Sequence, residues 1–138
     1  MRFIDANVFL YAVIKPKKPI SPKIIERKRK AKKILLRIQG GEEVVTTVVH
    51  LSEVANILEA KLGLTKAIEF LEELMFAENI HILPVTTEDY IKALIVAREK
   101  NVSVNDALAY IKMQEKNIKE IYTFDEHFNK LGVIVVNE

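Results

Sequence analysis

Short apolar stretches alternate with longer amphipathic stretches along the whole chain. The short stretches are rich in β-branched and aromatic residues, which predicts β-strands, at 3–10, 44–49, 80–84, 118–124 and 133–136. Between them apolar residues recur every three or four positions, which predicts helices, at 22–39, about 47–62, 65–79, 86–100 and from 103 onward. This alternation is typical of an α/β fold with a parallel sheet and right-handed crossovers.

The first dozen residues carry two polar side chains, Asp5 and Asn7, inside a nearly unbroken apolar run. The apolar residues of this run predict a central parallel strand that is covered on both faces; they are Phe3, Ile4, Val8, Phe9 and Leu10. Ligands of open α/β sheets gather outside the carboxyl ends of such strands, and we expect Asp5 at such an end. A buried carboxylate is costly unless it caps a turn or faces a cation, and both interpretations are open for Asp5.

Capping residues predict where several helices begin. Ser21-Pro22 combines an N-cap with proline at the first helical position. Thr86 with Asp89, and Ser103 with Asp106, have the spacing of capping boxes. A capping acid stabilises a helix start by roughly 0.5 to 2 kcal/mol without any further function, so capping alone is one interpretation of Asp106.

Length and composition limit the possible classes of protein. With 138 residues, 49% of them hydrophobic, the chain is long enough for one sizeable core, and we expect one domain over 1–138. No apolar run approaches the roughly 18 residues of a membrane span, and an early charge argues against a signal peptide, which favours the cytoplasm. Cysteine is absent, and His50, His81 and His127 are scattered without zinc spacing. Any metal is therefore expected to be a hard, oxygen-bound ion.

Positive charge is concentrated in one segment. Residues 15–33 hold ten basic side chains against one acidic one, although the net charge of the chain is only +2. The helix predicted at 22–39 is thus amphipathic and basic. It suits nucleic acid or an acidic partner, with a solvated helix face as the alternative. The candidates for contacting RNA or a partner are Arg27, Lys28, Lys30 and Lys33.

Four acidic residues occupy positions that could converge at one edge of the sheet. Asp5 and Asp125 lie at or just past strand ends, Glu53 lies in an apolar sector of its helix, and Asp106 lies in a first helical turn. Clustered carboxylates stay charged only beside a divalent cation, and Mg²⁺ or Mn²⁺ prefers oxygen ligands. Such a site suits phosphodiester hydrolysis. For Glu53, a side chain that extends to water is the alternative.

Other phosphate chemistries lack the residues they need. The four glycines form no glycine-rich loop with lysine, which excludes a P-loop enzyme. A haloacid-dehalogenase-like phosphatase would need a second aspartate where Asn7 stands. A receiver domain would need an aspartate after the third strand, where 84–88 offers none.

Four motifs, in this order and spacing, resemble those of the PIN-domain nucleases. They are Phe3-Ile-Asp5-Ala-Asn7, Ser52-Glu53-Val-Ala-Asn-Ile, Asn105-Asp106-Ala-Leu-Ala and Thr123-Phe-Asp125-Glu-His-Phe. Together they span nearly the whole chain, and the small single-domain form is similar to VapC-type toxins of toxin–antitoxin pairs. Ala6 departs from the pattern, because many members carry threonine or serine there.

The resemblance implies a fold, an activity and partners. The implied fold is an α/β/α sandwich, and the implied activity is that of a metal-dependent endoribonuclease. Its Mg²⁺ or Mn²⁺ would be held by Asp5, Glu53, Asp106 and Asp125. Asn7 and Thr123 would orient ligands or water around the ion. A homodimer and an antitoxin that blocks the site are also implied. The alternatives are a PIN nuclease of RNA processing without an antitoxin, and a non-catalytic module that binds RNA or protein.

Overall fold

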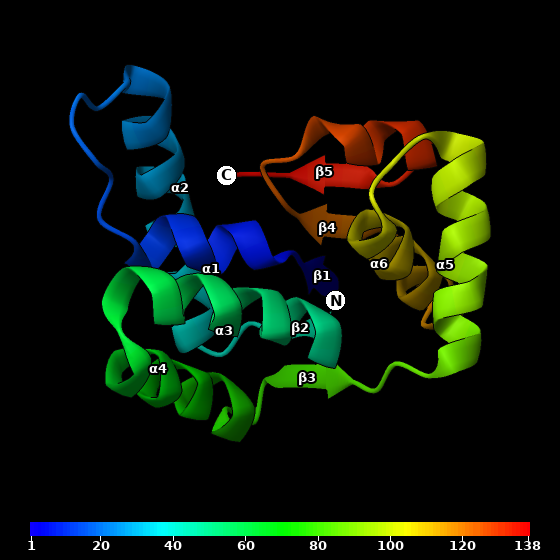
Figure 1. The fold of residues 1–138 in the computed structure, drawn as a ribbon, viewed down its shortest axis with the longest axis horizontal. Coiled ribbons are helices and arrows are strands. Elements are labelled where there is room, and N and C mark those ends of the chain that lie inside the picture. Colours follow the sequence, from blue (N-terminus) through cyan, green and yellow to red (C-terminus); the bar gives the residue numbers. More distant parts are fainter.

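Five parallel strands form the central sheet of this computed structural model, which describes all residues from 1 to 138 (Figure 1). They are β1 (Arg2–Ile4), β2 (Val44–Thr47), β3 (Ile80–Leu83), β4 (Glu120–Tyr122) and β5 (Ile134–Val136), in the spatial order β3-β2-β1-β4-β5. Every neighbouring pair is parallel, and Phe3 of the central strand β1 lies opposite Val45 of β2 and Ile121 of β4. The predicted parallel α/β sheet is confirmed.

Helices cover both faces of this sheet (Figure 1). The α-helices are α1 (Ala6–Val13), α2 (Pro22–Gln39), α3 (Val48–Leu62), α4 (Leu64–Phe76), α5 (Thr87–Lys100) and α6 (Val104–Glu115), and a 3₁₀ helix, η1 (Glu126–Leu131), precedes β5. Helices α1 to α4 share one core with the sheet, whereas α5, α6 and η1 pack against the opposite face. The α/β/α sandwich that the resemblance implied is therefore confirmed.

Side-chain alternation along the strands assigns apolar residues to the two cores. In β1, Ile4 joins the core beneath α1 to α4, whereas Phe3 joins the core beneath α6 and η1. Both side chains are fully buried, and burial of an apolar side chain of this size contributes about 1.5 to 3 kcal/mol. Because β1 is buried on both faces, its end points have little freedom to move, and the residue that follows it is held in a fixed position.

The first predicted strand is too long. β1 ends at Ile4, and Val8, Phe9 and Leu10 belong to α1 instead. Asp5 causes the change of structure, because its side chain accepts a hydrogen bond from the backbone N–H of Ala6 and caps the helix. Val8 and Phe9 are buried in the core shared with α2 and α3, so an apolar run that suits a strand equally suits a buried helix.

The predicted change from strand to helix near Thr47 is confirmed, because the Thr47 side chain accepts hydrogen bonds from the backbone N–H groups of Val49 and His50, which ends β2 and begins α3. Two other predicted boundaries shift. β4 is shorter than the predicted 118–124. α4 ends at Phe76 rather than near Asn79, whose side chain instead donates hydrogen bonds to the carbonyl oxygens of Ile38 and Glu42.

The predicted helix starts agree with the structure. The Ser21 side chain accepts a hydrogen bond from the backbone of Ile24, and Thr86 and Asp89 form a complete capping box. Ser103 accepts a hydrogen bond from the backbone of Asp106, but only this half of the second box is formed, which leaves the Asp106 carboxylate available for other contacts.

Among the helices of the chain, none combines the length and the apolar character that crossing a membrane requires.

Candidate active site

The two central strands β1 and β4 each lead into an aspartate. Asp5 directly follows β1, and its Oδ1 accepts a hydrogen bond from the backbone N–H of Ala6 at 2.9 Å. Asp125 follows β4 after two further residues and caps η1, with its Oδ1 accepting a hydrogen bond from the backbone N–H of His127 at 2.9 Å. Because β1 and β4 are parallel neighbours, both aspartates lie at the carboxyl edge of the sheet.

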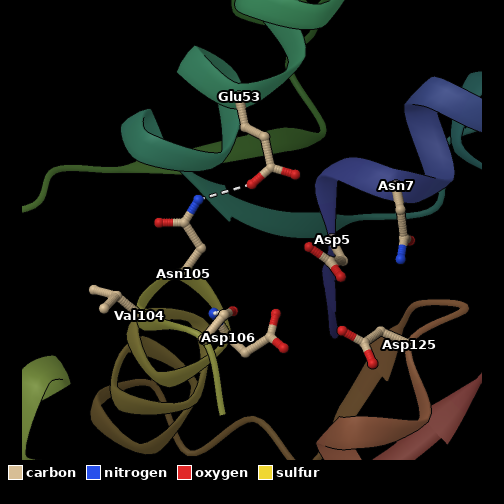
Figure 2. Close-up of a pocket in the computed structure, with 8 residues that line it drawn as sticks. Asp5, Asn7, Glu53, Val104, Asn105, Asp106 and Asp125 are labelled. Atoms are coloured by element: carbon tan, nitrogen blue, oxygen red, sulfur yellow. Dashed lines mark hydrogen bonds between the residues drawn. The ribbon is translucent and has the colours of Figure 1, made fainter. Parts of the chain in front are cut away.

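Helices α3 and α6 supply the other two acids. Glu53 lies in the second turn of α3, and Asp106 lies in the first turn of α6. Figure 2 shows all four carboxylates pointing toward a common space. This space is a cavity of about 400 Å³, lined also by Asn7, Ser103, Val104 and Asn105. The structure thus brings together the four acids selected from the sequence; we refer to this space as the acidic cavity.

Thr123 connects the two aspartates of the sheet edge. Its hydroxyl donates a hydrogen bond to Oδ2 of Asp5 at 2.8 Å and accepts one from the backbone N–H of Asp125 at 3.0 Å. The Asn7 side chain also donates to this hydroxyl, at 3.3 Å. The hydroxyl therefore has a defined direction, and it fixes the orientation of the Asp5 carboxylate.

A second chain of hydrogen bonds orients Glu53. The side-chain amide of Asn105 donates to Oε1 of Glu53 at 2.7 Å (Figure 2). The backbone carbonyl of Asn105 in turn lies 3.2 Å from Nε2 of the buried His50, whose Nδ1 lies 2.7 Å from the Thr47 hydroxyl. Burial lowers the pKa of His50 to about 4, so this imidazole is neutral at pH 7. His50 therefore ties the start of α6 to α3.

Burial and mutual repulsion make the acids of the cavity hard to ionise. Burial raises the pKa of Asp5 to about 7, and the charges of Glu53 and Asp125 act in the same direction, against the hydrogen bonds from Thr123 and Ala6. Burial, followed by a hydrogen bond with Asp125 and the nearby charges, also raises the pKa of Asp106 well above its ordinary value. These carboxylates lack the positive charge that would stabilise their ionised forms.

The composition of the acidic cavity suits a hard divalent cation. Its lining contains carboxylate and carboxamide oxygens but no lysine or arginine. No basic side chain forms an ion pair with Asp5, Glu53 or Asp106. Oxygen ligands with excess negative charge are those that Mg²⁺ and Mn²⁺ prefer in proteins. The residues present therefore fit such an ion.

His127 is a residue of this region that spacing arguments do not select. Asp106, Asp125 and His127 each offer one potential ligand atom, and these three atoms lie within 4.8 Å of one another. Nδ1 of His127 lies 3.2 Å from Oδ1 of Asp125. The spacing of the three histidines along the chain gives no sign of this arrangement. The available signal is local, because the turn at an N-cap aspartate brings the residue two positions later close to the capping side chain.

Comparison with known families supports one assignment. A family model described as PIN domain matches residues 2–134. The chain belongs to the PIN domain family. The four motifs that suggested this family are distributed over the same range, and the resemblance is confirmed. No curated protein sequence matches this PIN domain.

Solved structures share the fold of this PIN domain over nearly their whole length. VapC20 from Mycobacterium tuberculosis, described as a Sarcin-Ricin loop cleaving toxin, is 20% identical, with a TM-score of 0.77 and 100% of both chains covered. A toxin–antitoxin complex from Klebsiella pneumoniae is 13% identical, with a TM-score of 0.66 and coverage of 100% of this chain and 98% of the other. VapBC2 from Rickettsia felis, bound to a DNA fragment from its promoter, is 13% identical, with a TM-score of 0.66 and coverage of 99% and 97%.

The basic segment of this PIN domain has several distinct environments. Nη1 of Arg27 donates a hydrogen bond to the Tyr11 hydroxyl at 2.9 Å. Lys28 donates to three carbonyl oxygens at the C-terminal end of α1, those of Tyr11, Ala12 and Ile14. Lys30 is half-buried and Lys33 is exposed, and neither lines the acidic cavity. Lys28 thus satisfies the last carbonyls of α1, whereas Arg27 lines a cavity that also contains Asp125.

Proposed function

We propose that this PIN domain, acting as one domain over 1–138, is a metal-dependent endoribonuclease and the toxin of a toxin–antitoxin pair. The observation that supports this most directly is the convergence of Asp5, Glu53, Asp106 and Asp125 on one open cavity without any basic side chain. Four carboxylates in this arrangement are poorly suited to a purely structural role, because their repulsion opposes folding.

The proposed roles follow from the contacts of each residue. Asp5, Glu53, Asp106 and Asp125 would hold Mg²⁺ or Mn²⁺. Such an ion supplies positive charge that activates water and neutralises charge on a phosphodiester. The raised pKa values of Asp5 and Asp106 mean that loading of the site releases protons from the protein.

Neighbouring polar side chains would keep the acids in position. Thr123 orients Asp5 through its hydroxyl, and Asn105 orients Glu53 through its amide. Asn7 donates to Thr123 and also lines the acidic cavity, where its carboxamide can orient substrate or water. Removal of such a side chain commonly lowers metal affinity or activity by about 10-fold to 100-fold.

The toxin assignment draws on the solved structures of the same fold. VapC20 is described as a toxin that cleaves the Sarcin-Ricin loop, and two further matches are toxin–antitoxin complexes. We propose an RNA substrate and a small protein antitoxin for this chain on that basis. The test is co-expression with the product of an adjacent small gene, which should copurify with this chain and inhibit it. A cytoplasmic location stays a prediction, and it agrees with an RNA substrate.

We also propose a homodimer. Helix α5 exposes more than half of the side chains of Ile91, Leu94 and Ile95, which form one apolar stripe at helical spacing. A second copy of the chain would cover this stripe. The test is the molar mass in solution by light scattering, which should be twice that of the chain.

The experiment that tests the nuclease is cleavage of a structured RNA by the purified protein in Mg²⁺ or Mn²⁺, compared with EDTA and with Asp5→Asn. Circular dichroism checks that the variant is folded. Cleavage that requires the ion and Asp5 is the expected result. RNA that stays intact, while binding persists in EDTA, would favour the non-catalytic binding module instead.

A further inference from the structure

A second cavity adjoins the acidic cavity at the carboxyl edge of the sheet. Its volume is about 460 Å³, and it shares Asn7 and Asp125 with the acidic cavity. Its other lining residues come from α1, α2 and the segment around η1: Tyr11, Lys23, Arg27, Phe124, Glu126 and His127. A ligand that is long enough to occupy both cavities would therefore pass over Asn7 and Asp125.

Two basic side chains of α2 place positive charge in the second cavity. Lys23 and Arg27 are four residues apart and thus lie on one face of the helix. Neither forms an ion pair with an acidic side chain. The acids of this cavity are Asp125, which belongs to the proposed metal site, and the exposed Glu126. Both cations are therefore available to a negatively charged ligand.

Arg27 is held in place before any ligand binds. It donates a hydrogen bond to the Tyr11 hydroxyl at 2.9 Å, and its guanidinium carbon lies 5.5 Å from the centre of the Tyr11 ring. The Tyr11 ring packs edge-on against Phe124, with the ring centres 5.4 Å apart. A guanidinium has five N–H donors and Tyr11 uses one of them. The remaining donors match the oxygens of a phosphate group.

We propose that Lys23 and Arg27 form a phosphate subsite, which binds the RNA strand beside the phosphodiester that lies at the acids. The inference rests on the proposed ribonuclease function and extends it to the path of the strand. An RNA strand carries a phosphate at every nucleotide, so one strand supplies a ligand to each cavity. An acidic peptide could also bind Lys23 and Arg27, but RNA is favoured because its regularly spaced phosphates supply one anion to these two cations and another to the ion of the proposed site in the adjoining cavity.

Binding of RNA without cleavage tests the subsite. The probe is a fluorescein-labelled stem-loop RNA, whose anisotropy is measured in Mg²⁺ with Asp106→Asn as the non-cleaving background. In this background Lys23→Gln with Arg27→Gln should raise the Kd about tenfold or more at low salt. The log of the association constant falls linearly with the log of the salt concentration, and this slope should be less steep in the double variant by about 1.4. That difference corresponds to two lost phosphate contacts on a single strand.

Matched variants separate the subsite from general charge. Lys32→Gln with Lys116→Gln removes the same charge from exposed positions outside both cavities, and should change the Kd less than about twofold. Arg27→Lys, which keeps the charge but not the planar donors, should fall between the wild type and Arg27→Gln. Calorimetry with Mn²⁺ alone should give the double variant Lys23→Gln/Arg27→Gln the metal affinity of the wild type.

The outcomes distinguish the subsite from the nuclease. An unchanged Kd and salt slope in the double variant would overturn the subsite, even if the wild type cleaves RNA. Intact RNA binding with lost binding of an acidic protein partner would overturn it too, in favour of a protein contact. Weaker RNA binding in the double variant, with no metal-dependent cleavage by the wild type, would support the subsite and contradict the nuclease.

Discussion

Replacement of Asp106 by asparagine should stabilise the metal-free protein, although it removes a residue of the proposed site. Potential ligand atoms of Asp106 and Asp125 lie within 4.8 Å of each other. Two unit charges at that distance repel by about 3.5 kcal/mol at an effective dielectric constant of about 20. Because the acidic cavity is open to water, which screens this repulsion, we expect Asp106→Asn to raise the free energy of unfolding of the metal-free protein by only about 2 kcal/mol. Asparagine keeps the shape of the side chain, and its amide can donate a hydrogen bond to Asp125.

Thermal unfolding followed by circular dichroism measures this effect. At pH 8 in EDTA, the Tm of Asp106→Asn should exceed that of the wild type by about 6 °C. In Mn²⁺ the order should reverse, because an ion at 100 times its Kd stabilises the wild type by about 2.7 kcal/mol, whereas the variant has lost a ligand.

Asp89→Asn is the matched control, since Asp89 is also a buried aspartate, 5% exposed against 7% for Asp106. Its carboxylate lies 2.7 Å from Nζ of Lys112, and the hydrogen bond from Lys112 lowers the pKa of Asp89 to about 2. Breaking this pair should cost about 3 kcal/mol in EDTA and in Mn²⁺ alike. An Asp106→Asn variant that is also less stable in EDTA at pH 8 would refute the repulsion argument and favour Asp106 as a helix cap only.

Three further predictions concern pH, metal affinity and assembly. In EDTA the free energy of unfolding should fall as the pH rises from about 4 to about 7, because Asp5 and Asp106, whose pKa values are raised, keep protons in the folded state that the unfolded chain has released, and together they outweigh the opposite effect of His50, whose pKa is lowered; urea titrations that show stability rising over this window would contradict the assignment. Asn105→Ala should weaken Mn²⁺ binding by about 10-fold to 100-fold in calorimetry with little change in Tm, since it frees Glu53; an unchanged affinity would mean that Asn105 does not position a ligand. Leu94→Glu should convert the proposed dimer to a monomer in light scattering, because it places a charge on the apolar stripe of α5; a persistent dimer would exclude that stripe.

The sequence predicts most of the sheet because its strands are short, apolar and separated by amphipathic helices. Boundaries are less predictable where a side-chain cap decides them. Val8 and Phe9 suit a strand by composition, but the Asp5 cap and the neighbouring helices make them part of α1. These choices depend on hydrogen bonds and on packing partners distant in the sequence, which periodicity does not contain.

Three acids of the candidate site, Asp5, Asp106 and Asp125, are predictable because each sits at a strand end or at a helix start, which places it at the carboxyl edge of a parallel sheet. Glu53 lies in the second turn of α3 and is predictable from the apolar residues that surround it on that helix. Asp106 could have been only a capping acid, yet its carboxylate forms no return bond to the backbone of Ser103. The proximity of His127 depends on the turn at Asp125, and Lys28 is occupied by carbonyl oxygens of α1. Both follow from three-dimensional contacts that a list of charged residues along the chain does not reveal.

The most direct test of the central claim joins metal binding to cleavage. The Mn²⁺ affinity from calorimetry is compared with the Mn²⁺ concentration that gives half-maximal RNA cleavage, for the wild type and for Asp125→Asn. If the four acids hold the ion that is used in cleavage, the two values should agree for the wild type, and the substitution should weaken both together. Cleavage that continues in EDTA, or Mn²⁺ binding that is unaffected by Asp125→Asn, would contradict the account.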